Sequence, residues 1–294
     1  MRYEGLIYRP PSEAFSLILQ VTIGCSHNKC TFCSMYKQKK YRVRELAEIE
    51  ADIRMAKIAY GDVEKVFLAD GDALAVETET LLRILVTLRQ TFPSLRHIGI
   101  YASPGTILRK TPEELKSLYQ TGLTMAYLGV ETGDANLLQE IQKGVTPEEM
   151  IAAGQKLIRS GILLSCTVIL GLAGPDWGKT ERHARETALL INQISPHYLA
   201  ALTLMLEPGT ILYRKRQRGE FQLPEPYAII AELQVLVKHL EVQRACIFRS
   251  NHASNYLPIK GTLPQDQKAI LKALDQVLQK KEDKYLRPDY LRGL

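Results

Sequence analysis

The sequence predicts an α/β protein whose strands form a parallel sheet. Short apolar runs rich in β-branched residues recur along the 294 residues, and longer amphipathic stretches separate them. Strands that alternate with helices are typical of a parallel sheet with right-handed crossovers. A second observation is a repeated helix start, Thr111 to Glu114 and Thr146 to Glu149, with a threonine N-cap, a proline and a capping-box glutamate. One βα unit therefore repeats, as in a barrel or an open wound sheet.

The elements follow from hydrophobic periodicity in chain order. Apolar runs predict strands at 15–24, 65–69, 97–102, 125–131, 163–172, 198–206 and 244–249. Helical periodicity predicts helices at 44–60, 77–91, 112–120, 135–141, 147–160, 180–194, 226–242 and 264–281. The two helices with clear starts end near Gly122 and Gly161, where a glycine can close the last turn before the next strand.

Composition and cysteine content limit the class of protein. The chain is 46% hydrophobic and 24% charged, which is ordinary for a soluble globular protein with a large core. Its length fits one domain of barrel type or two smaller domains. Five cysteines, an odd number, do not indicate a disulfide framework and favour reduced thiols. Because no apolar stretch resembles a membrane span or a secretory signal, we expect a cytoplasmic protein.

The positive charge gives a weak preference for anionic partners. The net charge is +6 and the sequence pI is about 8.9, well below the charge density of a dedicated nucleic-acid-binding protein. Solvated loops and helix faces can account for both basic clusters. The first is also placed to meet a substrate phosphate or the acidic face of a reductase. The clusters are Lys37, Lys39, Lys40, Arg42 and Arg44, and Arg214, Lys215, Arg216 and Arg218.

Three cysteines, Cys25, Cys30 and Cys33, lie within nine residues directly after the first predicted strand. Three thiolates can hold three irons of a cubic iron–sulfur cluster and leave the fourth iron open to a small molecule. Zinc bound with His27 as a fourth ligand is an alternative, although no second Cys or His pair follows at a useful distance. A thioredoxin-like role for Cys30 and Cys33 leaves Cys25 unexplained. The spacing favours a cluster and leaves the zinc and redox roles open.

The segment from Gly24 to Cys33 resembles the signature loop of the radical S-adenosylmethionine (radical SAM) superfamily. In that loop three cysteines follow the first barrel strand, and an aromatic residue, here Phe32, precedes the third. The usual spacing has three residues between the first two cysteines, whereas this chain has four. The resemblance implies that Cys25, Cys30 and Cys33 bind a [4Fe–4S] cluster and that S-adenosyl-L-methionine (SAM) is the second cofactor.

Further segments resemble SAM-binding motifs of the same superfamily. Asp70, Gly71 and Asp72 follow the second predicted strand and are similar to the glycine-containing turn that receives the SAM amino group, without its Gly-Gly-Glu form. The segment Tyr127 to Asp134 resembles the fourth-strand motif of the branch with the coproporphyrinogen dehydrogenases, the methylthiotransferases and the Elongator catalytic subunit. That likeness implies that Glu131 contacts the ribose or the amino-acid end of SAM.

Two later segments complete the resemblance. The segment Val168 to Gly174, with Gly171 at its centre, looks like the fifth-strand segment that lies along the adenine. The segment Glu207 to Thr210 resembles the Pro-Gly-Thr turn after the sixth strand. The resemblance therefore implies a partial (β/α) TIM-like barrel of parallel strands over 15–251, after an N-terminal segment 1–14 and before a C-terminal helical extension 252–294.

The resemblance also implies a reaction. One electron enters the cluster, SAM is cleaved to methionine and a 5′-deoxyadenosyl radical, and that radical takes a hydrogen from an unknown substrate. A flavodoxin or a ferredoxin would supply the electron. A small-molecule substrate is favoured over nucleic acid, because the chain leaves little room for a separate tRNA-binding domain. The alternatives are a non-catalytic cluster or haem carrier on the same fold and a tRNA-modifying radical SAM enzyme.

Polar residues after the last predicted strand add candidates for the site. Arg249 and Asn251 begin a loop dense in hydrogen-bonding groups, which suits binding of the SAM carboxylate or of substrate. His252 is a possible proton donor or acceptor in the same loop. Cys166 and Cys246 lie in apolar runs and are expected to be small buried residues. One cluster only is therefore expected, which argues against sulfur-insertion chemistry that consumes a second cluster.

Overall fold

The computed structural model describes residues 1–293, and its strands form a mostly parallel sheet. Eight strands form one sheet in the order β1-β4-β5-β6-β7-β8-β9-β10, and β2 pairs with β3 in a separate two-stranded sheet. In the main sheet, β9 and β10 pair antiparallel, whereas β1–β4, β4–β5, β5–β6, β7–β8 and β8–β9 pair parallel. The strands are β1 (Leu17–Gln20), β2 (Thr22–Ile23), β3 (Arg42–Val43), β4 (Lys65–Ala69), β5 (His97–Ala102), β6 (Met125–Glu131), β7 (Leu163–Leu170), β8 (Tyr198–Thr203), β9 (Cys246–Ser250) and β10 (Ile259–Leu263).

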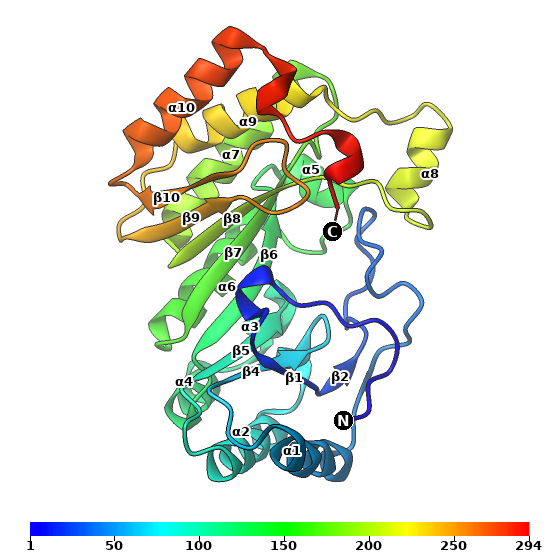
Figure 1. Cartoon of the computed structure of the whole chain (residues 1–294), viewed down its shortest axis with the longest axis vertical. Coiled ribbons are helices and arrows are strands. Elements are labelled where there is room, and N and C mark those ends of the chain that lie inside the picture. Colours follow the sequence, from blue (N-terminus) through cyan, green and yellow to red (C-terminus); the bar gives the residue numbers. More distant parts are fainter. Residues whose placement is uncertain (294) are drawn as a thin grey trace. The chain divides into compact units, whose positions relative to one another are not determined.

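Helices connect most of the parallel strands, as the crossover geometry of such a sheet requires. Figure 1 shows them in chain order along the colour bar. Among the described residues, no helix is long and apolar enough to cross a membrane. The α-helices are α1 (Leu46–Tyr60), α2 (Thr78–Thr91), α3 (Pro104–Arg109), α4 (Pro112–Thr121), α5 (Ala135–Glu140), α6 (Pro147–Arg159), α7 (Trp177–Ile194), α8 (Ile211–Gln217), α9 (Pro226–Lys238) and α10 (Gln267–Lys280), and the short 3-10 helices are η1 (Pro11–Glu13), η2 (Ala73–Ala75), η3 (Asp283–Tyr285) and η4 (Asp289–Leu291).

The chain divides into two compact units. The first unit holds residues 1–29, 35–128 and 153–164, and the second holds 30–34, 129–152 and 165–294. Cys25 therefore belongs to the first unit, whereas Cys30 and Cys33 belong to the second. The proposed division into segments 1–14, 15–251 and 252–294 stays a prediction, and the last of these segments contains β10 as well as α10.

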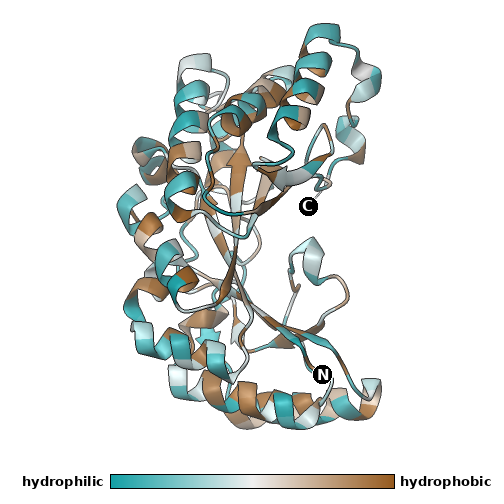
Figure 2. Ribbon diagram, turned by 90° about the vertical axis from the view of Figure 1, so that its left-hand side faces the viewer, coloured by the Kyte–Doolittle hydropathy of each residue, from teal (hydrophilic) through white to brown (hydrophobic). Residues whose placement is uncertain are grey.

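In the first unit, helices α1, α2 and α4 pack side by side on the parallel strands β1, β4 and β5. Their buried faces are aliphatic, with Ile49 and Ile53 from α1 and Leu81, Ile84 and Leu88 from α2. Figure 2 shows the strands mainly in brown, whereas the helices alternate between teal and brown, the pattern of amphipathic helices on a sheet. The observed capping box at Thr111 confirms the predicted start of α4.

In the second unit, β8 pairs parallel with β7 and β9, and β10 closes the edge as an antiparallel strand. Helix α9 packs against both α7 and α10. A buried aliphatic cluster forms around the segment that carries Cys30 and Cys33, and Phe32 packs against it. This cluster consists of Leu137, Ile141, Ile169, Leu172, Leu204 and Leu212.

The predicted fold class is confirmed, with differences at particular elements. The first predicted strand, 15–24, is two strands, because Val21 changes partners: its N–H donates to Ala69 O in β4 and its carbonyl accepts from Arg44 N beside β3. The sequence reading missed α3 and α8, which are too short to show helical periodicity. It also missed β10, an edge strand with no continuous apolar run.

Candidate functional site

The turn after β4 holds the start of the cysteine loop in the first unit. Gly71 N–H donates to Gly24 O at 3.1 Å, and Gly24 N–H donates to Asp70 Oδ2 at 3.0 Å. Asp70 N–H in turn donates to Thr22 Oγ1 at 3.0 Å. These bonds tie the end of β2 to the turn, so the backbone that enters Cys25 has one defined position.

Asp70 is a fully buried carboxylate whose two oxygens differ. Its Oδ2 accepts hydrogen bonds from Gly24 N, from Gln20 Nε2 at 2.9 Å and from Lys39 Nζ at 2.9 Å. Its Oδ1 is buried and has no hydrogen-bond partner among the described residues. Because an unsatisfied buried carboxylate oxygen is costly, this atom is suited to accept a donor from a ligand.

Asp72 holds the hydroxyl group next to Cys25. Its carboxylate accepts from Ser103 N at 2.9 Å, from Ser103 Oγ at 2.8 Å and from Thr106 Oγ1 at 2.7 Å. The Ser26 hydroxyl donates to the same carboxylate. Asp72 is therefore well supplied with protein donors, and it fixes the residue that follows Cys25. Contact of Asp70 and Asp72 with SAM stays a prediction.

Gly71 lies where no side chain fits. A Cβ added there would lie 2.4 Å from the Tyr36 ring and 3.0 Å from Cys25 Cβ. The first distance is shorter than real Cβ contacts allow, and the second is tighter than most of them. The backbone of the turn thus lies directly against Cys25, and glycine is required for this approach rather than for its backbone angles.

The longer spacing between Cys25 and Cys30 contains a left-handed turn. Asn28 has a φ of 43°, a conformation that asparagine tolerates better than most residues. Its side-chain amide donates to Tyr36 O at 2.8 Å, and Lys37 Nζ donates to Asn28 O at 2.7 Å. The loop is therefore held by its own hydrogen bonds around the position where the spacing departs from the usual motif.

The segment of Cys30 and Cys33 is fixed within the second unit. Thr31 N–H donates to Ile141 O at 2.9 Å, and Leu212 N–H donates to Thr31 O at 3.0 Å. Phe32 packs against the aliphatic cluster described above. The aromatic residue before the third cysteine is thus an apolar anchor for this short segment.

The five cysteines fall into two groups by burial. Cys25, Cys30 and Cys33 are half-buried, whereas Cys166 and Cys246 are fully buried. Burial raises the pKa of Cys166 well above its ordinary value and that of Cys246 to about 12. These two thiols therefore stay protonated at neutral pH and are poor metal ligands. In the described part of the chain, no three His, Cys, Asp or Glu side chains are gathered as a preformed metal site, so the ligand assignment stays a prediction from the spacing.

Glu131, the last residue of β6, occupies a strained turn. Its φ is 66°, and Thr132 N–H donates to Val130 O at 2.9 Å, which closes a three-residue turn around Glu131. Such turns are rare and strained for a residue other than glycine. The carboxylate accepts from Lys143 Nζ at 2.7 Å, with both side chains about nine-tenths buried. Strained positions of this kind are concentrated at functional sites.

Two glycine turns of the second unit are held by side chains from the helices. Gly171, with a φ of 85°, donates its N–H to Glu232 Oε2 at 2.9 Å. Gly133 donates its N–H to Thr187 Oγ1 at 2.9 Å. The turns after β6 and β7, both predicted to contact SAM, are therefore each anchored by one polar side chain, from α7 or from α9.

The polar loop after β9 is held by the C-terminal tail. Arg287 Nη1 donates to the carbonyls of His252, Ala253 and Asn255 at 2.8, 2.8 and 2.9 Å. Burial lowers the pKa of His252, and the charge of Arg287 lowers it further, so this imidazole is neutral at pH 7. Arg249 and Asn251 are exposed. The Arg249 guanidinium donates to Phe248 O at 2.8 Å, and contact of Arg249 or Asn251 with SAM stays a prediction.

The two basic clusters differ in how their charges are paired. In the first cluster, Lys39 pairs with Asp70, Arg42 pairs with Glu4, and Arg44 pairs with Asp52. In the second cluster, Arg218 pairs with Glu220. Within residues 1–293, no ion pair neutralises the three cations of α8 itself, Arg214, Lys215 and Arg216.

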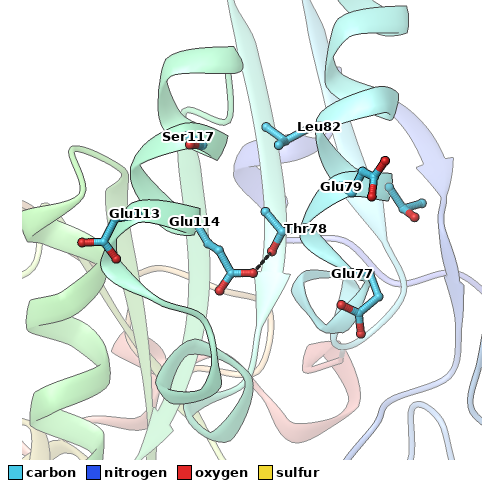
Figure 3. A pocket seen from close by; sticks show the side chains of 8 residues that line it. Glu77, Thr78, Glu79, Leu82, Glu113, Glu114 and Ser117 are labelled. Atoms are coloured by element: carbon cyan, nitrogen blue, oxygen red, sulfur yellow. Dashed lines mark hydrogen bonds between the residues drawn. The ribbon is translucent and has the colours of Figure 1, made fainter.

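A hollow of about 730 Å³ lies between the first turns of α2 and α4 in the first unit. Figure 3 shows its acidic lining and the hydrogen bond from Thr78 to Glu114, which measures 2.5 Å. Acidic side chains stabilise the N-terminal ends of helices, so helix capping accounts for them. None of the predicted site residues lines this hollow. The acidic residues are Glu77, Glu79, Glu113 and Glu114.

Sequence reasoning missed three residues that hold the turns of the second unit: Lys143, His183 and Glu232. For two of these residues, the sequence contained a feature that could have identified them. Glu232 is a lone acid in a strongly apolar helix, and His183 lies four residues before Thr187 on one face of α7. Lys143 had no such feature, because it follows α5 in an irregular segment.

Comparison with known proteins gives a family match over more than half of the chain. The model described as "Radical SAM superfamily" matches residues 19–187. The heme chaperone HemW of Bacillus subtilis is 25% identical over 221 residues, which are 72% of this chain and 56% of HemW. The chain spans about half the length of the curated relatives it matches, or less.

Solved structures share the fold. Coproporphyrinogen III oxidase HemN of Escherichia coli aligns with a TM-score of 0.57 and 18% identity over 76% of this chain and 51% of HemN. The methyltransferase TsrM of Kitasatospora setae, solved with cobalamin and a [4Fe–4S] cluster, aligns with a TM-score of 0.55 and 18% identity over 69% of this chain and 39% of TsrM. The sheet of this chain is therefore that of a partial TIM-like barrel.

Proposed function

Because the chain belongs to the radical SAM superfamily, we propose that it is an enzyme that cleaves SAM reductively and abstracts a hydrogen atom from a small-molecule substrate. Proteins of this superfamily use a [4Fe–4S] cluster and SAM. In the proposal Cys25, Cys30 and Cys33 hold the cluster. When bound, the cluster supplies the electron that cleaves SAM to methionine and a 5′-deoxyadenosyl radical.

The observation that carries the proposal is the turn after β4 in the first unit. Its backbone at Gly71 lies against Cys25, and its neighbour Asp70 has a buried carboxylate oxygen without a partner among the described residues. The ammonium group of an amino acid would supply the missing donor beside the first cysteine. A purely structural zinc site has no need of such an acceptor. The residues present therefore fit SAM next to a cysteine-bound cluster.

The turn at Glu131 supports the proposal from the second unit. A carboxylate can accept two hydrogen bonds from the hydroxyl groups of a ribose, and Glu131 has a strained backbone and a lysine partner that a ligand could replace. An added Cβ at Gly129 would lie 2.1 Å from Glu131 Oε1, so this glycine leaves room for the carboxylate. We assign Glu131 to the SAM ribose or amino-acid end and Gly171 to the adenine.

We further propose that a small acidic electron carrier of the flavodoxin or ferredoxin type reduces the cluster. Helix α8 supports this assignment, because its Leu212 N–H donates to Thr31 O, between Cys30 and Cys33. The exposed or half-exposed cations of this helix are complementary in charge to an acidic partner. These cations are Arg214, Lys215 and Arg216.

The test is SAM cleavage by anaerobically reconstituted protein under a strong reductant. The wild-type protein is expected to release 5′-deoxyadenosine, and Cys33→Ala is expected to release none because it loses a cluster ligand. Cys246→Ala is the matched control, since this buried thiol should retain both iron and cleavage. Persistent cleavage by Cys33→Ala would refute the ligand assignment.

The similarity to the heme chaperone HemW favours a second candidate, a carrier of haem on the same fold. This candidate predicts that the reconstituted wild-type protein releases no 5′-deoxyadenosine and binds haem in stoichiometric amount, seen as a Soret band. Haem binding together with SAM cleavage would leave the enzyme proposal standing, whereas haem binding without cleavage would replace it.

A further inference from the structure

A buried histidine–glutamate pair lies between α7 and α9 in the second unit. His183 is 2% exposed and Glu232 is fully buried. His183 Nε2 lies 3.2 Å from Glu232 Oε1 and 3.2 Å from Ile169 O. The other ring nitrogen, Nδ1, lies 2.7 Å from the Thr132 hydroxyl oxygen. The imidazole is therefore contacted on both nitrogens.

The pair connects two turns that are distant in the sequence. On one side, Thr132 directly follows Glu131, and Thr187 Oγ1 lies 3.3 Å from His183 Nδ1 while it accepts the N–H of Gly133. On the other side, Glu232 Oε2 accepts the N–H of Gly171. A continuous chain of polar contacts thus runs from the turn after β6 to the turn after β7.

Stability alone does not explain this chain of contacts. Removing a carboxylate from water costs several kcal/mol by order of magnitude, and replacing both members of a buried pair by packed apolar residues is often neutral or stabilising. Glu232 is surrounded in α9 by Ile229, Ile230 and Leu233, so an apolar residue would suit its helix. Its Oε1 has no partner of hydrogen-bond geometry among the described residues, so its 3.2 Å proximity to His183 Nε2, rather than a second hydrogen bond, relates it to His183.

We propose that His183 and Glu232 are positioning residues that set the spacing between the Glu131 turn and the Gly171 turn and thereby the affinity for SAM. The inference rests on the proposed function, because it takes SAM as the ligand of both turns. Neither residue touches SAM in this proposal. Glu232 orients the backbone N–H of Gly171, and His183 orients Thr132.

The experiment measures SAM binding by equilibrium dialysis to the cluster-loaded protein without reductant, so that no turnover occurs. Glu232→Leu removes the acceptor for Gly171 N and should weaken SAM binding by about tenfold or more, the effect of one unsatisfied buried donor. Glu232→Gln keeps an acceptor oxygen and should bind SAM within about threefold of wild type. Because Glu232→Leu leaves the buried Gly171 N–H without an acceptor, its melting temperature should fall, as in the control variant below, and SAM affinity is what separates the two.

Asp52→Asn is the matched control, because Asp52 is also a buried carboxylate that lies against a basic side chain, Arg44, at 2.8 Å. It should lower the melting temperature and leave SAM affinity unchanged. Should Glu232→Leu not fold, Thr132→Val decides, since it removes the hydroxyl group that contacts His183 Nδ1 and accepts Asp134 N–H in the same turn, and it should weaken SAM binding several-fold.

The outcomes separate the two proposals. If the wild-type protein binds SAM and Glu232→Leu binds it with equal affinity, the positioning role is overturned and the proposed function stays intact. If Glu232→Leu does not fold, equal SAM affinity in Thr132→Val has the same consequence. Loaded wild-type protein that does not bind SAM would overturn both. A matched fall in SAM affinity and stability in every variant, Asp52→Asn included, would also overturn the positioning role, because it would mark a general loss of packing.

Discussion

The turns after β4 and β6 both carry carboxylates that the sequence assigns to SAM, but they use them differently. In the first unit, Asp72 accepts hydrogen bonds from the backbone N–H and the hydroxyl group of Ser103, the N-cap of α3, and from the hydroxyl group of Thr106 within α3. It also accepts one from the Ser26 hydroxyl group. In the second unit, Glu131 accepts from the Lys143 ammonium and lies in a strained turn. The first carboxylate organises the protein, whereas the second has a strained conformation of the kind that is concentrated at functional sites.

The difference shows that a motif position does not by itself define a role. Asp72 is bound to the residue beside Cys25, so its removal would disturb the cluster loop before it affected SAM. Glu131 is instead paired with a lysine on a flexible stem, which can move with the carboxylate when a ligand binds. Substitutions in one turn at a time test whether the two carboxylates have different roles.

The largest effect is expected at Glu131. Glu131→Gly and Glu131→Gln should both weaken SAM binding by about tenfold or more, because each removes the carboxylate. Glu131→Gly should also be more stable than Glu131→Gln by about 1 kcal/mol, because glycine has no penalty at a φ of 66°. Equilibrium dialysis with SAM and urea unfolding check the two effects. Unchanged SAM affinity in both variants would reduce Glu131 to a structural residue.

The next effect is expected at Gly71. Gly71→Ala places a Cβ 2.4 Å from the Tyr36 ring and should destabilise the protein by about 1–3 kcal/mol, the usual cost of overpacking. Iron content after reconstitution should also fall, because the same Cβ lies 3.0 Å from Cys25 Cβ. Gly105→Ala in α3 is the control, since its nearest contact is 3.7 Å away. Normal iron loading in Gly71→Ala would show that the turn does not set the position of Cys25.

The same two turns show which features of the fold and of the candidate site the sequence predicts. Strands β4, β5 and β6 were predicted to the residue, because each is a short apolar run bounded by turn residues. The order of the candidate motifs along the chain was predicted as well. The hydrogen-bond partners of the turns were not predicted. Ser26 and Asp72 are 46 residues apart in the sequence, and Gly171 and Glu232 are 61 residues apart. A hydrogen bond over such distances leaves no periodic signal in either segment.

A smaller effect is expected from pH, in a network of the first unit at the opposite ends of the strands. Glu13 is buried, and His97 Nε2 lies 2.8 Å from its Oε1. Burial alone would raise the pKa of Glu13, but hydrogen bonds from His97 and two hydroxyl groups outweigh it, so the pKa is lowered.

A lowered pKa in the folded state fixes the sign of the pH dependence. The stabilisation by Glu13 is complete above the ordinary glutamate pKa and is lost as the pH falls through the lower folded value. Glu13→Gln should therefore reduce the loss of stability between neutral and acidic pH, measured by urea unfolding at several pH values. Its SAM affinity at neutral pH should match wild type, since no residue of this network belongs to a turn that is proposed to contact SAM. A fall in SAM affinity would contradict that division.

The smallest effect is expected on helix α8 of the second unit. The double variant Arg214→Glu with Arg216→Glu should slow SAM cleavage driven by flavodoxin by a few-fold at low salt, because complementary charge mainly raises association rates. The difference from wild type should shrink as salt screens the charges. Cleavage driven by a small chemical reductant should be unchanged, because SAM and the cysteines are untouched. For a matched change of charge, the single variant Arg42→Glu on the first basic cluster should have less effect than the single variant Arg214→Glu, since Arg42 is already paired with Glu4. An equal effect of both changes would point to net charge rather than to a docking face beside Cys30 and Cys33.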